Sequence, residues 1–230
     1  MQSIDQLIEA TRLEAARAPF PVDTEVYEKA GKNPGEPVLY AGSLAARVAI
    51  MGRDLGKDEV AAGQPLIGAG GRLVRGGIYR AIHNAEPPAK DKGLESVLDH
   101  VLLTNTVPFK PPGNKAYPDK VKERFRPLVA SLLVEHFTGR KILTLGTEAF
   151  RWYSCYAADG VFDEFWARAD RYEADLDCTI RVDTPDGTRT KVVTISPLPH
   201  PSPLNQRWYK LFPGLLARRL ATALTGPGTG

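Results

Sequence analysis

The chain has 230 residues, of which 43% are hydrophobic, and its 30 Lys and Arg side chains against 27 Asp and Glu give a formal net charge of +3. A chain of this size can bury one ample core, so we expect a single domain over residues 1–224 and a flexible tail over 225–230. The near balance of charge excludes a strong overall positive field, so any polyanion must meet a local basic patch.

The sequence shows neither a membrane span nor a signal peptide. No apolar stretch reaches the length that crosses a bilayer, and residues 1–6 lack the basic and apolar blocks of a signal peptide. The two cysteines, Cys155 and Cys178, are too few for a four-thiolate zinc site or an iron–sulfur cluster. We therefore expect a cytoplasmic protein without membrane contact, metal or cofactor.

Apolar runs and helical patterns alternate along the chain. Ser3 can cap a first helix that runs to Arg17. Four buried strands are predicted at residues 48–51, 101–104, 141–145 and 192–195. Helices are predicted at about 72–84, 119–138, 147–157 and 205–224. A hairpin that turns at Pro185–Gly187 leads into the fourth strand.

This alternation predicts an α/β fold, a three-layer sandwich whose central, mostly parallel, four-stranded sheet is flanked by helices. Ligands of such folds bind at the carboxyl ends of the strands. Asp54 follows the first strand, Asn105 the second and His200 the fourth. Taken singly, each also suits a turn, a cap or a surface loop. If each residue were only a turn or cap residue, there would be no reason for all three to follow core strands. We therefore expect these side chains to face one crevice.

In the loop that contains His200, every second residue from 199 to 203 is a proline. Each proline fixes its own φ and pushes the residue before it toward extended geometry. Leu204 can therefore project from the surface at little cost in chain entropy. A glycine-rich stretch at 63–73 also leads into a helix, but it fails as a dinucleotide fingerprint because Leu73 replaces the third glycine. Backbone N–H groups at Gly68, Gly70 and Gly71 can still bind a phosphate.

Five segments, in this order, resemble the uracil-DNA glycosylase superfamily over about residues 46–220. They are Gly52–Gly56, Gly63–Gly71, Leu103–Val107, Leu145–Gly146 and His200–Leu204. The chain is most similar to the branch called family four, whose members carry an iron–sulfur cluster. It lacks the four cysteine ligands of that branch, so the loops that the cluster would brace must be held by ordinary packing.

The first motif departs from its relatives. Asp54 stands where the uracil-specific enzymes have a water-directing aspartate, but Leu55 replaces a proline and Gly56 a bulky tyrosine. Leu66 stands where the cluster-bearing relatives have a phenylalanine that stacks on the flipped uracil. Because Gly56 and Leu66 are both smaller, our hypothesis is that the pocket admits larger deaminated bases such as hypoxanthine or xanthine.

The resemblance implies a monofunctional glycosylase that hydrolyses the N-glycosidic bond of uracil in DNA and initiates base excision repair. It assigns catalysis to Asp54, Asn105 and His200, and an intercalating wedge to Leu204. Base-binding residues are expected at Gly52, Arg53, Leu55, Gly56, Leu66 and Asn105. DNA contacts are expected from Gly68, Gly70, Gly71, Lys110, Lys115, Pro201, Ser202, Pro203, Leu204 and Arg207. We expect a monomeric, nucleoid-associated protein of bacterial type.

The sequence leaves two other functions open. A non-catalytic protein on the same fold could bind damaged bases or single-stranded DNA, a reading that the divergent residues Arg53 and Leu55 favour. An unrelated nucleotide-dependent α/β enzyme could use the turn at residues 68–71, although the failed fingerprint argues against it. Release of free base separates the first alternative from catalysis, and calorimetric nucleotide binding tests the second.

Overall fold

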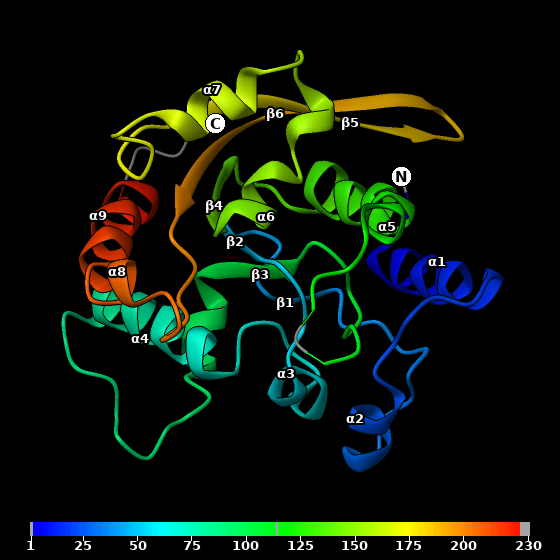
Figure 1. The fold of residues 1–230 in the computed structure, drawn as a ribbon, viewed down its shortest axis with the longest axis horizontal. Coiled ribbons are helices and arrows are strands. Elements are labelled where there is room, and N and C mark those ends of the chain that lie inside the picture. The colour runs from blue at the N-terminus through cyan, green and yellow to red at the C-terminus, as the bar shows by residue number, and fades with distance from the viewer. Residues whose placement is uncertain (1, 114, 226–230) are drawn as a thin grey trace.

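The structure, a computed structural model, describes residues 2–113 and 115–225. A six-stranded sheet with the order β1–β3–β2–β4–β6–β5 runs through the middle of the molecule, and helices cover both of its faces (Figure 1). The expected tail at 225–230 lies outside the described residues, except for Thr225 at the end of the last helix. In these described ranges no helix has the length and apolar character needed to cross a bilayer.

The four predicted strands form the parallel centre of the sheet. They are β2 (Val48–Gly52), β3 (Val101–Asn105), β4 (Lys141–Leu145) and β6 (Gly187–Leu198). Two antiparallel edge strands correct the expected count of four to six: β1 (Tyr40–Gly42) beside β3, and β5 (Leu176–Thr184) beside β6. Three residues are too few for β1 to show a periodic pattern, whereas β5 is the first arm of the predicted hairpin.

The first helix, α1 (Ile4–Arg17), begins as predicted, because the Ser3 hydroxyl accepts a hydrogen bond from the Gln6 N–H. The helices predicted at about 72–84, 119–138 and 147–157 correspond to three observed helices. These are α4 (Ala69–His83), α5 (Asp119–Ser131), which is followed by a π-turn at Leu132–His136, and α6 (Thr147–Arg151), which is shorter than predicted and is followed by a 3-10 turn at Ser154–Tyr156. The last predicted helix is broken into α8 (Gln206–Tyr209) and α9 (Phe212–Thr225). Pro213 accounts for this break, since proline has no N–H and disfavours helical geometry in the residue before it.

Three short helices were not predicted: α2 (Thr24–Lys29), α3 (Lys57–Ala62) and α7 (Val161–Ala167). A 3-10 turn at Glu95–Asp99 also lies before β3. Segments of six or seven residues complete fewer than two helical turns, so their apolar spacing is not diagnostic. Two of these helices matter below, because α2 and α3 contribute residues to the cleft at the sheet edge.

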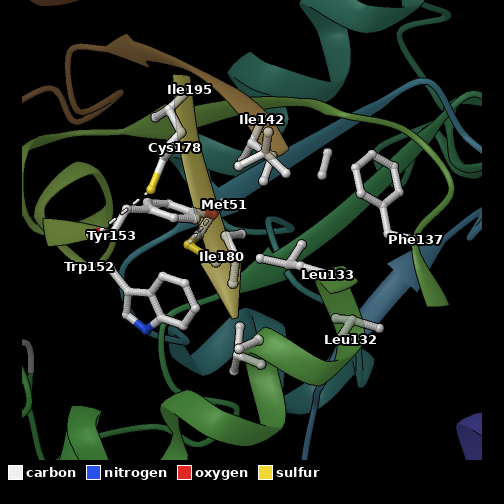
Figure 2. Close-up of a cluster of buried hydrophobic side chains, with 14 of the residues drawn as sticks. Met51, Leu132, Leu133, Phe137, Ile142, Trp152, Tyr153, Cys178, Ile180 and Ile195 are labelled. Atoms are coloured by element: carbon white, nitrogen blue, oxygen red, sulfur yellow. Dashed lines mark hydrogen bonds between the residues drawn. The ribbon is translucent and has the colours of Figure 1, made fainter. Parts of the chain in front are cut away.

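Side chains of the sheet alternate between two hydrophobic clusters. Val48 and Ile50 face the cluster beneath α4 and α9, whereas Ala49 and Met51 face the cluster beneath α1, α5, α6 and α7. Figure 2 shows the second cluster, in which the Tyr153 hydroxyl donates to the sulfur of Met51 across 3.3 Å. The strands that carry the candidate residues are thus fixed from both sides.

An aromatic cluster holds the loop that follows β3. Phe20, Phe109 and Phe125 have ring centroids 5.0–5.2 Å apart, and the Arg124 guanidinium lies 5.2 Å from the rings of Phe20 and Phe125. Tyr117 completes the buried group. Such pairs stabilise by about 0.5–1.5 kcal/mol each beyond area burial. Ordinary packing therefore joins the N-terminal segment, the loop after β3 and α5.

Candidate active site

The carboxyl ends of the parallel strands open into a cleft of about 1000 Å³. From β2 the chain continues to β3 on one side, and from β4 to β6 on the other, so their loops diverge at this edge. Such a divergence is where open α/β sheets place their ligands. The cleft is lined by Leu66, from the turn before α4, and by residues from all four strand ends: Gly52, Arg53, Asp54, Leu55, Gly56, Asn105, Leu145, His200, Pro201, Ser202 and Leu204.

Asp54 lines this cleft with a side chain that is only 4% exposed. Its Oδ2 accepts a hydrogen bond of 2.7 Å from the Nε of Arg53, and its buried Oδ1 has no hydrogen-bond partner among the described residues. Desolvation raises the pKa of Asp54, while the charge and the hydrogen bond of Arg53 oppose the rise. A carboxylate with a free oxygen is thus held facing the cleft.

Asn105 ends β3 directly opposite Gly52 and is 2% exposed. Its Oδ1 is buried and has no hydrogen-bond partner among the described residues. A Cβ at Gly52 would lie 3.2 Å from the Asn105 Nδ2 and 3.2 Å from the Leu66 Cδ2. The absence of a side chain at Gly52 therefore leaves room for both the Asn105 amide and the Leu66 methyl beside its backbone in the cleft.

His200 reaches the cleft from the loop after β6. Its backbone oxygen accepts hydrogen bonds from the N–H of Ser202 at 2.9 Å and from the Nδ2 of Asn205 at 3.2 Å. Gly146 has a φ of +86°, and a Cβ there would lie 3.1 Å from the His200 Cβ. His200 has a large exposed fraction, yet surrounding protein desolvates the ring, and this effect, with the charge of Arg53, lowers its pKa. The imidazole is therefore neutral at neutral pH and carries one N–H donor.

Leu204 projects from the same loop with 93% of its surface exposed. The loop beneath it is anchored: Pro201 is buried, and a Cβ at Gly70 would lie 2.9 Å from the Pro201 carbonyl oxygen. The Ser202 hydroxyl also accepts a 3.3 Å hydrogen bond from the Leu204 N–H. A fully exposed leucine on a fixed loop suits insertion into a partner better than packing within this chain.

The structure corrects the role expected for Gly56. A Cβ at Gly56 would lie 2.4 Å from the Oε2 of Glu59, on α3. The space left by the small residue is thus filled by a carboxylate instead of being open to a larger base. Of the two reasons for a wide pocket, only Leu66 remains.

Glu59, which the sequence did not single out, also changes the expected phosphate site. Its Oε1 accepts hydrogen bonds from the N–H groups of Ile67 at 3.1 Å and Gly68 at 2.8 Å. Gly70 packs on Pro201, and a Cβ at Gly71 would collide with the Leu66 carbonyl carbon at 2.0 Å. The Gly68 donor is therefore occupied, and Gly70 and Gly71 are needed for close packing. No sequence pattern links an acid in one short helix to amides eight and nine residues later.

Lys110 is a second correction, because its ammonium is not available to a DNA phosphate. The residue is 3% exposed, and its Nζ donates to the Asp23 Oδ2 at 2.8 Å and to the carbonyls of Pro111 at 2.9 Å and Gly113 at 2.7 Å. These bonds use all three of its protons. Lys110 and Asp23 anchor the loop after β3 to the N-terminal segment.

The remaining expected DNA contacts lie on the surface. Lys115, Pro203 and Arg207 are exposed, and Ser202 is partly exposed. The Arg207 guanidinium lies 5.0 Å from the Trp208 ring centroid. Among the described residues, no three His, Cys, Asp or Glu side chains are grouped to hold a metal, and both cysteines are free thiols.

Comparison with known proteins identifies the family. A family model described as the uracil DNA glycosylase superfamily matches residues 39–223, which include every strand and the cleft residues Asp54, Asn105 and His200. No curated protein matches the chain. Because the family model spans most of the sequence, the chain belongs to the uracil DNA glycosylase superfamily, whose members are glycosylases that act on DNA.

Proposed function

We propose that this protein hydrolyses the N-glycosidic bond of uracil in DNA and so initiates base excision repair. The observation that carries the proposal is that Asp54, Asn105 and His200, which are far apart in the sequence, line one cleft at the carboxyl edge of the sheet. Family membership gives the chemical class, and these three side chains provide one group for each task of base excision.

Asn105 binds the Watson–Crick edge of the extruded base. Its Oδ1, which is buried and unpartnered, accepts from the N3–H of uracil, and its Nδ2 donates to the O4. Cytosine presents the reverse pattern and leaves both groups unsatisfied. A buried acceptor without a partner costs about 1–3 kcal/mol, so this amide favours a ligand that supplies the missing donor.

Asp54 and His200 stabilise opposite charges as the bond to the base breaks. The bonding electrons leave with the base, the sugar gains oxocarbenium character, and water adds to its anomeric carbon and loses a proton to solvent. Ionised Asp54 stabilises the sugar cation and directs this water. The neutral His200 ring donates a hydrogen bond to the base oxygen on which negative charge develops.

Leu204 fills the space that the extruded nucleotide leaves in the duplex and offsets part of the unstacking cost of a few kcal/mol. Ser202, Lys115 and Arg207 contact phosphates near this wedge. The hypothesis of larger substrate bases, such as hypoxanthine, now depends on Leu66 alone. We expect DNA containing uracil as the main partner and a monomeric enzyme.

The test is release of free base from oligonucleotides that carry uracil, hypoxanthine or xanthine, followed by alkali cleavage at the abasic site. Purified protein should release uracil under single-turnover conditions and leave cytosine-containing strands intact. A protein that shifts the uracil oligonucleotide on a gel, but leaves no alkali-labile site, would be a damage-binding protein instead. Release of uracil but no larger base would reject the wider substrate range.

A further inference from the structure

Arg75, in the middle of α4, is a buried cation whose role the reaction does not explain. The residue has no exposed surface, and its guanidinium donates to four acceptors: the Leu66 carbonyl at 2.9 Å, the Pro65 carbonyl at 3.0 Å, the Gln64 Oε1 at 3.1 Å and the Gly93 carbonyl at 2.8 Å. None of these acceptors is charged. Desolvation lowers the pKa of this arginine, although nearby Glu95 and Glu59 oppose the shift. A buried charge without a hydrogen-bonded carboxylate is costly, so it needs a compensating role.

The four hydrogen bonds converge on a turn with unusual backbone geometry. Leu66 has a φ of +56°, a left-handed conformation that a leucine disfavours. Arg75 binds the carbonyls of Pro65 and Leu66 itself, so it fixes the peptide groups on both sides of this residue. Gly71 leaves room for the Leu66 carbonyl, because a Cβ there would lie 2.2 Å from that oxygen. The turn is thus held from α4 against its own preference.

The turn controls where the Leu66 side chain lies. The Leu66 Cδ2 is 3.2 Å from the Cβ position of Gly52, and the Asn105 Nδ2 is equally near that position. Leu66 and Asn105 also line the same cleft. If the backbone of Leu66 relaxed to negative φ, this methyl group would move away from the amide that faces the base.

We propose that Arg75 is a positioning residue that holds Leu66 as a wall beside Asn105 and thereby sets which bases the pocket accepts. This inference rests on the proposed glycosylase function. Arg75 does not touch the base, and its effect passes through the left-handed turn. When the Leu66 side chain moves away from Asn105, the pocket becomes too wide to hold uracil firmly, whereas a larger base still fits the wider space.

The test compares Arg75→Lys with a matched control, Arg219→Lys. Arg219 is also a buried arginine that binds main-chain carbonyls, those of Glu173 and Ala174, but it does not line the cleft, and it differs from Arg75 in also pairing with a carboxylate, that of Asp175, at 2.7 Å. Lysine cannot reproduce the planar fork of donors at either site. Both variants are measured below their unfolding transitions, which circular dichroism locates.

The first measurement is amide hydrogen exchange at Ile67 and Gly68, whose N–H groups donate to Glu59 across the turn. Arg75→Lys should speed this exchange at least about tenfold, because bonds to a charged donor are lost, while Arg219→Lys should leave it unchanged. Equal exchange in the two variants overturns the inference. Arg75→Met, which keeps the volume but removes the charge, serves the same measurement if the lysine variant does not fold.

The second measurement is base release from uracil and hypoxanthine oligonucleotides. Arg75→Lys should lower kcat/KM for uracil about tenfold or more, mainly through KM, and change hypoxanthine release less, since small changes in an apolar pocket shift discrimination by about 10–200-fold. An unchanged ratio of the two rates, or the same change in Arg219→Lys, contradicts the inference. If wild-type protein releases no base, the proposed function fails, and the exchange measurement still decides the role of Arg75.

Discussion

Two polar clusters line the same cleft and differ in how their hydrogen bonds are used. In the anchor cluster, Lys110 and Asp23, every proton of the ammonium has an acceptor. In the reaction cluster, formed by Asp54, Asn105 and His200, the Oδ1 atoms of Asp54 and Asn105 are buried and have no partners among the described residues. Buried polar groups are normally paired, so an unpaired acceptor in a cleft marks a place where a ligand supplies the donor. Satisfied groups hold this cleft together, and unsatisfied groups are available for chemistry.

The largest effect should follow from Asp54→Asn. The amide keeps the volume and an acceptor for Arg53, but it cannot stabilise a sugar cation. We expect a loss of at least about 10²–10³ in the single-turnover rate of uracil release, the size typical for a charge-stabilising group. Desolvation of the ionised carboxylate is also relieved, so thermal stability should not fall. Wild-type rates in this variant would remove Asp54 from the chemistry.

His200→Ala should cost about 10²–10³ in the same rate, because a donor aimed at developing negative charge is lost. Binding of uracil-containing DNA, measured by anisotropy, should change much less than the rate. Excision within about threefold of wild type would count against this role for His200.

Lys110→Met sharpens the comparison, because it disrupts the anchor cluster instead of the reaction cluster. Removing one partner of a fully buried ion pair destabilises by about 3–5 kcal/mol, and we expect a smaller loss in denaturant unfolding here, because Lys110 is buried but Asp23 is partly exposed. The salt dependence of DNA binding should stay unchanged, since this ammonium contacts no phosphate. Arg207→Ala is the control and should reduce the salt slope by about one. An equal reduction in both variants would return Lys110 to the DNA interface.

Leu204→Ala should have a smaller effect, about tenfold on excision from duplex DNA, since part of the compensation for unstacking is lost. Single-stranded substrate needs no such wedge and serves as the internal control. A loss of equal size on both substrates would show that Leu204 does not act by filling the duplex.

The smallest expected effect is a shift in the pH dependence of the rate, which tests the pairing of Arg53 with Asp54. In the proposed mechanism activity needs ionised Asp54, so it should fall as the pH drops through the pKa of that group, which burial raises. Arg53→Gln removes the charge that opposes this rise, so the acid limb of the rate profile should move to higher pH. Besides burial, the charge of Arg53 also lowers the pKa of His200, so the same profile is measured in His200→Ala, where Asp54 is the remaining titrating group of the reaction cluster. An acid limb that moves to lower pH in Arg53→Gln would contradict the pairing of Arg53 with Asp54.

Much of the candidate site was predictable because it follows strand ends. The four parallel strands have continuous apolar runs, so their order along the chain suffices to put Asp54, Asn105 and His200 at one sheet edge. Glu59 and Arg75 could not be found in this way. Their partners lie across turns at Gly68 and Leu66, and no local pattern of charge or hydropathy records such contacts.

The sequence alone determined the α/β architecture, the family resemblance and the three residues at the strand ends, because each depends on local periodicity or on a contiguous motif. Tertiary structure alone decided which polar groups are satisfied. The sequence pattern marks Lys110 as an available cation, yet folding surrounds it with acceptors, and the pocket space expected at Gly56 is filled by Glu59. Hydrogen-bond saturation and excluded volume depend on atoms brought together from distant segments, which a linear pattern does not encode.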